Sequence, residues 1–325
     1  MKFIVKTLKS FNKITLLQKV FIVLLILVFA LLIVNNFDNN NSYNEGFQGE
    51  NILDKNNFFE VKRDQEIYDD FYSQHYDKIF LNKTKNNFEI GKIINLDKKN
   101  KHTKILDIGC GTGNHVNLLK NKSYDVIGID QSKDMINRAK LNYPNCEFIA
   151  KDFFKNDFDY GSFSHILCLG RTIYEIKNKE TFFETCHSLL NHNGLLILNL
   201  SDIKNFRPYV LEQNDNNTLF DSSQYGKIPQ KMIIKFTKNM EFLSNYENIS
   251  NYENYDNINV PTSVFRDKFE NFKTHSVRKN ELNLYIYPIK DIVNLVKSCG
   301  FKFYKKFSMH HLKHSGEYLY IFEKI

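Results

Sequence analysis

The chain has 325 residues, enough for one large domain with an appendage and too few for two full catalytic domains of ordinary size. With 42% hydrophobic and 25% charged residues, its composition is that of a globular protein that buries a core. The net charge of +7 is concentrated at the N-terminus, because residues 1–34 hold five lysines and no acid. The remaining residues carry only +2 and no concentrated basic stripe, which disfavours a nucleic-acid partner.

Residues 20–34 form an unbroken apolar run, VFIVLLILVFALLIV. As a helix these residues rise about 22 Å, so a flanking turn and a snorkelling Lys19 are needed to cross a hydrocarbon core of about 30 Å. The segment after the run has no small-x-small cleavage site, which favours an uncleaved helix over a signal peptide. We therefore expect residues 1–34 to hold a basic N-terminus and one transmembrane helix.

Two observations point to opposite sides of the membrane for the rest of the chain. Lysines precede the apolar run and acids predominate directly after it, so the positive-inside rule places the N-terminus in the cytoplasm and the domain on the far side. Scattered, unpaired cysteines favour the reducing cytoplasm for the domain. The two alternatives stay open.

The segment between the apolar run and the domain is rich in asparagine. We expect residues 35–56 to form a flexible linker and residues 57–325 to form the globular domain. The domain begins with Val61–Phe80, in which apolar residues recur at helical spacing, so this segment is predicted to be a helix.

From Lys104 onwards, apolar strands alternate with helix-like segments. Such alternation predicts a parallel sheet with helices on both faces. The predicted strands are Lys104–Ile108, Tyr124–Asp130, Cys146–Ala150, Phe163–Leu169 and Gly194–Leu200, and the predicted helices lie near Asn114–Asn121, Ser132–Leu141 and Lys179–Asn191.

The sequence KILDIGCGTGNHVNLL carries the strongest chemical signal. An apolar strand ends in Asp107, and Gly109, Gly111 and Gly113 alternate into the start of a helix. Glycines in such a turn let the backbone approach a ligand closely, and the free N–H groups of the helix suit an anionic group. A dinucleotide site needs a third glycine where Asn114 stands, so the pattern disfavours NAD.

Two further predicted strands end in acids. YDVIGID ends with Asp130, 23 residues after Asp107, and CEFIA is followed by Asp152 and Phe153. An acid at a strand end can accept both hydroxyls of a ribose. A second carboxylate can accept from an adenine amino group while an aromatic ring flanks the base. Each acid alone could cap a helix, but their joint spacing favours one shared ligand.

Residues 201–285 interrupt the alternation, and we expect them to form an insertion or cap. Their tyrosine-rich stretch Asn245–Asn257, with its doubled NYEN, is interpreted as a low-complexity loop. A helix over Pro288–Cys299 follows. Its proline suits the first turn, and the glycine after it suits the C-terminal cap.

Two strands, Phe301–Ser308 and Glu317–Glu323, close the chain around a tight turn at Ser315–Gly316, which makes this pair antiparallel. No metal site is expected. The five cysteines lack CxxC pairs, and His310 and His311 would point to opposite faces of a continuing strand. Together with His314 they are interpreted as part of a surface hairpin.

The DxGxGxG loop and the two acids after it resemble the class I S-adenosylmethionine-dependent methyltransferase family, over roughly Phe58–Ile325. The resemblance implies an α/β fold with a Rossmann-like, doubly wound seven-stranded sheet whose last strand is antiparallel, and S-adenosylmethionine as cofactor. By this resemblance, Asp107 and the glycine loop would hold the methionine part, Asp130 the ribose, and Asp152 with Phe153 the adenine. The implied cofactor-binding residues are Asp107, Gly109, Gly111, Gly113, Asp130, Gln131, Asp152, Phe153, Leu169 and Tyr72, with Tyr76 as an alternative to Tyr72 in a helix over the cofactor.

The family pattern ends at the fourth strand, where catalytic or substrate groups often lie. This sequence has no NPPY-like motif and no cysteine nucleophile pair there. The candidates are Arg171, which could pair with an acidic acceptor, and Tyr174, which could orient it. The alternative that both residues only close the loop carries equal weight.

We therefore expect a membrane-tethered, S-adenosylmethionine-dependent methyltransferase that binds a small-molecule acceptor beneath the 201–285 insertion. The first alternative is a membrane-tethered protein that binds the cofactor and acts as a scaffold without turnover. The second alternative is an NAD oxidoreductase, which the glycine pattern disfavours. The sequence specifies neither the acceptor atom nor the oligomeric state.

Overall fold

The computed structural model describes residues 59–96, 103–203, 206, 218–220, 231–237, 240–248, 262–312 and 316–325. The chain divides into two units, Met1–Ile52 and Leu53–Ile325, and all described residues belong to the second. The predicted transmembrane helix at 20–34 and the linker at 35–56 therefore lie outside the described residues. Within the described part, no helix combines the length and apolarity needed to cross a bilayer.

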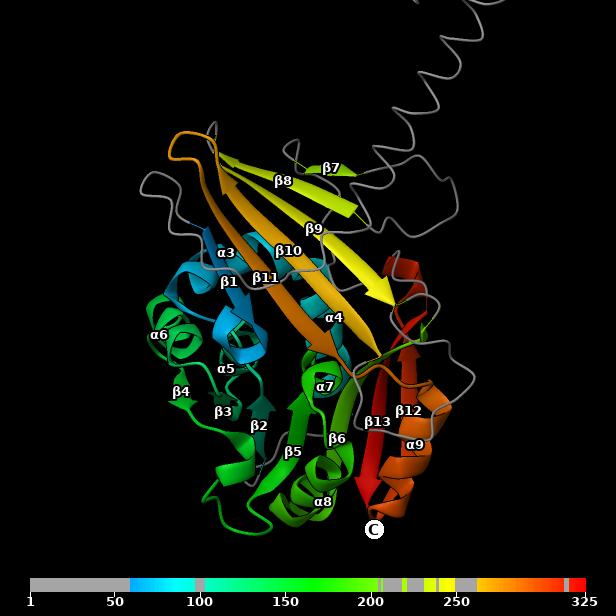
Figure 1. Ribbon diagram of the computed structural model, residues 1–325. Coiled ribbons are helices and arrows are strands. Elements are labelled where there is room, and N and C mark those ends of the chain that lie inside the picture. The colour runs from blue at the N-terminus through cyan, green and yellow to red at the C-terminus, as the bar shows by residue number, and fades with distance from the viewer. Residues whose placement is uncertain are drawn as a thin grey trace, which may run out of the picture. The chain divides into compact units, whose positions relative to one another are not determined.

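The larger of two sheets has seven strands in the order β12-β13-β6-β5-β2-β3-β4 (Figure 1). Neighbouring strands from β6 to β4 pair in parallel, whereas β13 pairs antiparallel with both β6 and β12. The Rossmann-like sheet with an antiparallel last strand is thus confirmed. Its strands are β2 (Lys104–Ile108), β3 (Asp125–Asp130), β4 (Glu147–Ala150), β5 (Phe163–Cys168), β6 (Leu190–Ser201), β12 (Phe301–Ser308) and β13 (Glu317–Lys324).

Both faces of this sheet are covered, which explains why its strands are apolar almost throughout. Successive residues of β2 show this: Leu106 packs with one buried cluster and Ile105 with the other. One cluster includes α8 (Lys179–Leu189) and α9 (Ile289–Ser298). The other includes α4 (Lys83–Ile94), α5 (Asn114–Lys120) and α6 (Lys133–Asn142). The sheet is therefore doubly wound, and α4 is the one of these helices that the sequence analysis did not predict.

The predicted helix over Val61–Phe80 is shorter in the structure. It is divided into strand β1 (Phe59–Arg63), a 3-10 turn (Asp64–Ile67) and helix α3 (Asp70–Phe80). The first residues are extended because they pair in parallel with a strand of the second sheet, which satisfies their backbone groups. Asp69 begins α3, where its carboxylate accepts a hydrogen bond from the backbone N–H of Tyr72 at 3.1 Å.

The second sheet has six strands in the order β1-β11-β10-β9-β8-β7, and it lies at the end of the molecule toward which β2 and β5 point (Figure 1). The described part of the 201–285 insertion therefore consists largely of sheet. Asn245–Asn248, predicted as loop, belong to β9 because they pair with β10, and residues 249–257 lie outside the described residues. Besides β1, the strands of the second sheet are β7 (Thr218–Phe220), β8 (Lys231–Thr237), β9 (Met240–Asn248), β10 (Ser263–Asn271) and β11 (Ser276–Leu284).

Buried polar bonds fasten α3 to this second sheet, and we call them the α3 clamp. The guanidinium of Arg278 donates to the two carboxylate oxygens of Asp69 at 2.9 and 2.7 Å and to the carbonyl of Ile67 at 2.8 Å. The hydroxyl of Tyr72 donates to the Asp267 carboxylate at 3.0 Å. The position of α3 is thus set by residues 195 to 211 positions later in the chain.

The closing helix and hairpin follow the prediction, with one correction. Gly300 ends α9 with φ +87°, and a Cβ there would lie 2.7 Å from the His187 ring. After β12 the chain does not continue as a strand: His310 and His311 lie in a 3-10 turn (His310–Leu312), where the His311 ring packs on Phe88. His314 lies outside the described residues.

Candidate functional site

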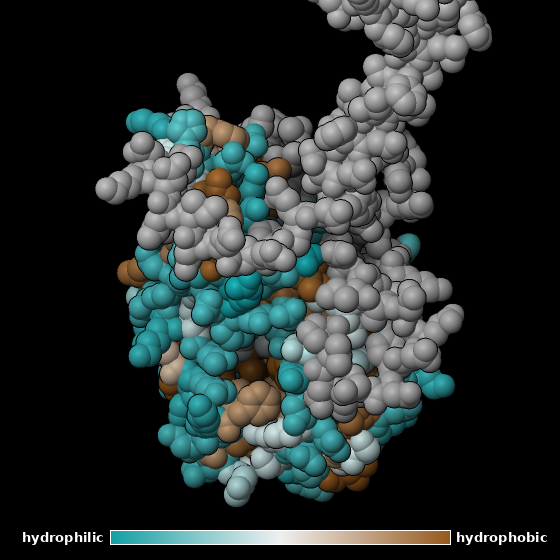
Figure 2. Space-filling model, viewed as in Figure 1, coloured by the Kyte–Doolittle hydropathy of each residue, from teal (hydrophilic) through white to brown (hydrophobic). Residues whose placement is uncertain are grey.

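Two cavities lie at the carboxyl ends of β2, β3, β5 and β6. Cavity A has a volume of about 130 Å³ and cavity B a volume of about 310 Å³. Figure 2 shows a hollow with hydrophobic surface in and below it, on the face where β2 and β3 end in Figure 1. The two cavities share part of their wall, so they lie side by side. Their shared lining residues are Tyr76, Gly109, Gly111, Thr172 and Glu175.

The three predicted glycines have different roles. A Cβ on Gly111 would meet its nearest side-chain atoms at 3.5 and 3.7 Å, so the backbone there is open to a ligand. Gly113 begins α5 with φ +88°, and a Cβ would lie 2.5 Å from the Phe148 ring. Gly109 is equally tight against Thr172 but lines both cavities, whereas Gly113 lines neither. Gly113 therefore serves the packing of the turn rather than ligand contact.

Asp130 lies at the end of β3 and lines cavity B, as does Gln131 beside it. Its carboxylate accepts from the backbone N–H of Gly111 at 3.0 Å and from that of Ser132 at 2.9 Å. These bonds join the second strand end to the glycine loop and hold the carboxylate in place. Burial dominates its electrostatics and raises the pKa of Asp130 to about 6, against the two backbone donors.

Asp152 and Phe153 also line cavity B. Asp152 caps a 3-10 turn (Phe153–Lys155) by accepting from the backbone N–H of Phe154 at 3.0 Å. The capping role considered for this acid is therefore real, and it coexists with a place in the cavity wall. Phe153 is 7% exposed and packs against Phe182, so the ring has a fixed position.

Asp107 lines cavity A at the end of β2, with an exposed fraction of 1%. Its Oδ2 atom has no hydrogen-bond partner. Burial raises the pKa of Asp107 to about 7, although the charge of His115 acts in the opposite direction. A buried carboxyl oxygen without a partner is costly, so this atom indicates a ligand that brings a donor.

The structure favours Tyr76 over Tyr72 as the tyrosine beside the ligand. Tyr76 lines both cavities, whereas Tyr72 lines neither. Residues four apart on α3 face similar directions, but the Tyr72 hydroxyl is directed to Asp267 in the α3 clamp. Tyr72 was implied by the family resemblance of this helix, which cannot distinguish two tyrosines four residues apart.

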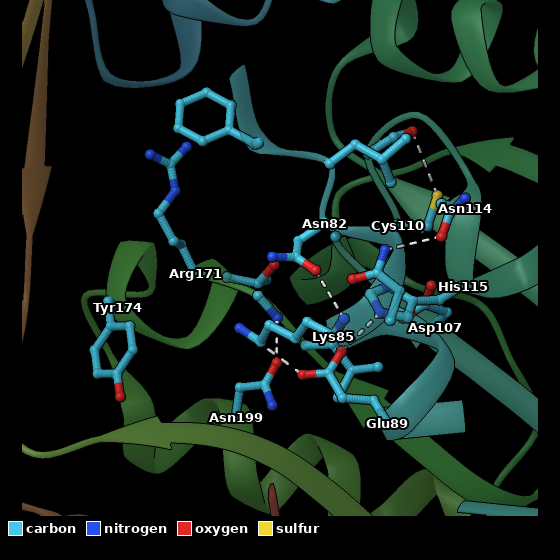
Figure 3. A pocket seen from close by; sticks show the side chains of 18 of the residues that line it. Asn82, Lys85, Glu89, Asp107, Cys110, Asn114, His115, Arg171, Tyr174 and Asn199 are labelled. Atoms are coloured by element: carbon cyan, nitrogen blue, oxygen red, sulfur yellow. Dashed lines mark hydrogen bonds and ion pairs between the residues drawn. The ribbon is translucent and has the colours of Figure 1, made fainter. Parts of the chain in front are cut away.

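The two catalytic candidates and Leu169 line cavity A. Arg171 stacks on the Phe80 ring at 4.1 Å, and its Nε lies 3.9 Å from Glu175. Tyr174 is 1% exposed, and its hydroxyl accepts from the backbone N–H of Ser201 at 2.6 Å. In Figure 3, Tyr174 points away from the other labelled side chains. Tyr174 therefore links the segment after β5 to the end of β6 and contributes little polar surface to the cavity.

Glu175 was not predicted, although it lines both cavities. Its two oxygens accept from the hydroxyl of Tyr68 at 2.7 and 2.8 Å. Burial raises the pKa of Glu175, against the opposing charge of Arg171 and the Tyr68 hydrogen bond. This pair joins the segment before α3 to helix α7 (Thr172–Glu175) across the shared part of the cavities.

Five further charged residues of cavity A were also missed: Asp77, Lys85, Glu89, His115 and Glu317. A signal was present for two of them, since Lys85 and Glu89 stand four residues apart on α4, a helix whose apolar Ile90, Ile93 and Ile94 recur at helical spacing. His115 lies in the motif itself. No signal in the sequence could have placed Glu317 there, because β13 reaches the site only through sheet order.

The fold and the site together define a class. The sheet is doubly wound, and the antiparallel strand β13 lies beside β6. A glycine loop follows β2, an acid ends β3 and another acid follows β4. This is the arrangement of a class I S-adenosylmethionine-dependent methyltransferase domain. Residues 105–194 match the family model described as a methyltransferase domain. The open backbone at Gly111, the partnerless oxygen of Asp107 and the acids of cavity B fit S-adenosylmethionine, the cofactor of this family.

Known proteins of the same kind resemble this chain. It is 28% identical to a glycine/sarcosine N-methyltransferase of Parasynechococcus marenigrum (strain WH8102) over 142 residues, which are 41% of this chain and 50% of that protein. The CcbJ methyltransferase from Streptomyces caelestis superposes with a TM-score of 0.57 at 12% identity, covering 79% of this chain and 97% of that one. An S-adenosylmethionine-dependent methyltransferase from Clostridium acetobutylicum ATCC 824 gives 0.56 at 14% identity, covering 78% and 98%.

The chain spans about half the length of the curated relatives it matches. Solved structures at such low identity establish the fold alone. The acceptor of this protein therefore has to be argued from its own cavities.

Proposed function

We propose that the protein is an S-adenosylmethionine-dependent methyltransferase acting on a small-molecule acceptor. The observation that carries this proposal is that cavities A and B lie side by side with Gly109 and Gly111 in the wall of both, so that a single ligand passing the glycine loop would reach Asp130 in one and Asp107 in the other. The cofactor supplies a methyl group on a sulfonium, which is already a good leaving group. The residues of the chain then have to bind, orient the acceptor in line and exclude water.

We place a small acceptor at the Arg171 side of cavity A, beyond the Asp107 side that the cofactor would reach. The cavity has a volume of about 130 Å³, and α3 and α4 contribute to its wall. From the 201–285 insertion, Ser201 and Phe206 belong to the described lining, and Phe265 packs 5.4 Å from the Arg171 guanidinium. The name of the Parasynechococcus relative gives glycine and sarcosine as its acceptors, which is in keeping with a small molecule.

Within this proposal Arg171 orients the acceptor. Its guanidinium is held by stacking on Phe80 and by Glu175, and it stays charged because the pKa of Arg171 is raised by neighbouring tyrosines and Glu175 despite burial. A fixed cation in the wall of cavity A favours an acceptor with an anionic group. The hydrogen bond from the Ser201 backbone N–H to the Tyr174 hydroxyl helps to fix the segment after β5 that carries Arg171.

Cofactor binding is the first test. Titration of the purified full chain with S-adenosylmethionine is expected to give saturable binding, and Asp130→Ala is expected to weaken it by about 10-fold or more, since hydrogen bonds to a charged group contribute about 1.5–3 kcal/mol. Asp125→Ala, on the exposed start of the same strand, is the matched control and should bind normally. Unchanged affinity of the Asp130 variant would contradict the assignment.

Turnover is the second test. S-adenosylhomocysteine should appear when the full chain is incubated with cofactor and small acceptors that carry a carboxylate, and Arg171→Met should lower the rate with little effect on cofactor affinity. Cofactor binding without any product across carboxylates, amines and hydroxyl acceptors would instead support a scaffold that binds the cofactor.

We also propose, from the sequence, that residues 20–34 anchor the protein in a membrane. The run has the apolar character of a short span with basic residues before it. Expressed in cells, the full chain should stay in the membrane pellet after alkaline carbonate extraction, whereas a variant with three leucines of the run replaced by lysine should be released. Release of both proteins alike would refute the anchor.

A further inference from the structure

Glu175 ends the short helix α7 and stands in the wall that the two cavities share. Its side chain is 15% exposed. Figure 3 shows Arg171, beside which we place the acceptor, on the opposite side of cavity A from Asp107. A carboxyl group that faces both cavities therefore lies between the cofactor and the acceptor, where the methyl group would be transferred.

Two neighbours hold this carboxylate in place. The Tyr68 hydroxyl donates to its two oxygens at 2.7 and 2.8 Å, and Nε of Arg171 lies 3.9 Å from Oε1. Tyr68 is itself fixed, because its backbone carbonyl accepts from the Ser132 hydroxyl. A carboxylate has about four acceptor sites, and the one hydroxyl proton of Tyr68 occupies only part of them. Glu175 therefore keeps the capacity to accept hydrogen bonds from a ligand in either cavity.

The charges around Glu175 favour a cation as this ligand. Burial raises the pKa of Glu175, and the charge of Arg171 and the Tyr68 hydrogen bond oppose this effect. The charge of Asp64 raises it further. Glu175 in turn adds to the raised pKa of Asp130, which burial dominates. Two carboxyl groups and one guanidinium thus act on Glu175, so a cation that enters beside it relieves repulsion among the carboxyl groups.

A small acceptor with an anionic group can be methylated on a carboxylate, a hydroxyl or an amine. A carboxylate as the acceptor would bring a like charge against Glu175. An ammonium instead offers a positive charge and several donors, and it has to lose one proton before its nitrogen can attack. A positioned carboxyl group with a raised pKa is suited to take that proton.

We propose that the methyl acceptor is an amine nitrogen and that Glu175 is the catalytic residue that binds the ammonium and takes its proton. This inference rests on the proposed function, in which Arg171 binds an anionic group of the same molecule. The ammonium passes one proton to the Glu175 carboxylate, and the nitrogen lone pair forms the new N–C bond as the C–S bond breaks. The electron pair of the broken bond stays on sulfur. The products are an N-methylammonium and neutral S-adenosylhomocysteine, and the proton on Glu175 passes to water.

Matched acceptors test the nature of the accepting atom. The probes are glycine, L-alanine and β-alanine, with glycolate, L-lactate and 3-hydroxypropanoate as their hydroxyl counterparts. With the full chain and S-adenosylmethionine, at least one amino acid should give S-adenosylhomocysteine and a product that carries the methyl group on nitrogen, located by mass spectrometry and stable to alkali. The hydroxy acids should give no product. Methylation of the hydroxy acids alone, or methyl esters that release methanol in alkali, would overturn the inference and leave the proposed function standing.

Glu175→Gln tests the residue. The variant keeps the size of the side chain and an oxygen for Tyr68 but cannot take a proton. Turnover of the amino acid should fall by about 100-fold or more. In the presence of S-adenosylhomocysteine, calorimetry should show that the same amino acid binds about 10-fold more weakly or worse. Affinity for S-adenosylhomocysteine itself should stay within about 2-fold, because its sulfur is neutral. Glu180→Gln, on the exposed first turn of α8, is the matched control and should behave as wild type.

A second variant covers the case in which Glu175→Gln folds poorly. Tyr68→Phe removes the hydroxyl that holds the carboxylate and keeps its charge, so turnover should fall by about 10-fold or more with unchanged affinity for S-adenosylhomocysteine. Wild-type turnover in either folded variant overturns the inference, as does a loss of turnover that only follows the loss of S-adenosylhomocysteine affinity. If the wild-type chain forms no S-adenosylhomocysteine with any acceptor, the proposed function fails and the inference fails with it.

Discussion

A single turn of this protein uses glycine for two unrelated physical reasons. Gly111 keeps the backbone open beside the cavities, while Gly113 prevents a collision between the start of α5 and the Phe148 ring of β4. Gly113→Ala should therefore destabilise the domain by at least ~2 kcal/mol, because it combines a positive φ with a Cβ 2.5 Å from a buried ring. Denaturant unfolding measures this cost.

Gly111→Ala is the informative companion. Its φ of +54° imposes a backbone penalty of about 1–2 kcal/mol, but the nearest side-chain atoms are at contact distance. The main effect should be on cofactor affinity, since the added methyl group occupies space in both cavities. A Gly111→Ala protein that binds the cofactor normally would show that the loop does not touch the ligand.

At Asp107 the same burial has opposite consequences for stability and for binding. Its pKa of about 7 in the folded protein exceeds the usual value, so between about pH 4 and pH 7 the folded state keeps a proton that the unfolded state has lost. Asp107 therefore lowers the stability of the cofactor-free protein as pH rises through this window.

If the cofactor's methionine end lies at Asp107, as the family resemblance implies, its ammonium binds the ionised carboxylate. Cofactor affinity should then rise with pH and level off above about pH 7, changing by up to about 10-fold per unit below it. Titration with S-adenosylhomocysteine between about pH 5.5 and pH 8.5 tests this. Asp107→Asn should weaken binding and reduce this dependence, leaving the smaller step of Asp130 near its pKa of about 6. A flat wild-type profile would remove Asp107 from ammonium binding.

At the scale of elements, two tyrosines of α3 differ in role: Tyr72 holds the helix in place, whereas Tyr76 lines the cavities. Tyr72→Phe leaves the buried Asp267 carboxyl with one donor fewer, which should cost about 1–3 kcal/mol of stability. Tyr76→Phe should leave stability within about 0.5 kcal/mol and change cofactor affinity or turnover instead, because Tyr76 lines both cavities. Thermal unfolding together with cofactor titration distinguishes the two, and a reversed pattern would restore Tyr72 as the ligand residue.

The elements also show where sequence reasoning succeeds. The strands and helices between Lys104 and Leu200 were predictable because their apolar periodicity and their glycine and acid boundaries are local signals. The second sheet was not, because polar and aromatic stretches such as NYENISNYENYDN give no clear alternation, and β1 becomes a strand only by pairing with Val277–Glu281. Local pattern cannot reveal a partner that lies more than 200 residues away.

The residues of the candidate site also differ in whether local sequence signals could predict them. The strand-end acids and the glycine loop could be named from sequence because the motif fixes their spacing. Glu175 and Glu317 could not, since they enter the cavities through helix packing and sheet order. For Glu89 the sequence signals a helix but not the place of that helix beside the cavity. The tyrosine beside the cofactor could be narrowed to two candidates, and only the contact of Tyr72 with Asp267 separates them.

At the scale of the whole domain, Arg278 connects the two sheets through α3. It is 6% exposed, and its removal leaves Asp69 without two close hydrogen bonds. Arg278→Met should cost about 3–5 kcal/mol, as expected when one partner of a buried ion pair is removed. Arg266→Met, which loses a more exposed pair with Glu281, should cost no more than about 1 kcal/mol. Equal losses in denaturant unfolding would contradict a special role for the clamp.

The position of β13 has a consequence for biosynthesis. The final strand of the chain lies between β6 and β12, so it forms two interfaces of the larger sheet, and it carries Glu317 into cavity A. During translation the nascent domain cannot close this sheet or complete the wall of that cavity until Glu317–Lys324 have left the ribosome. Loss of β13 would leave β12 without its partner and expose the edge of β6.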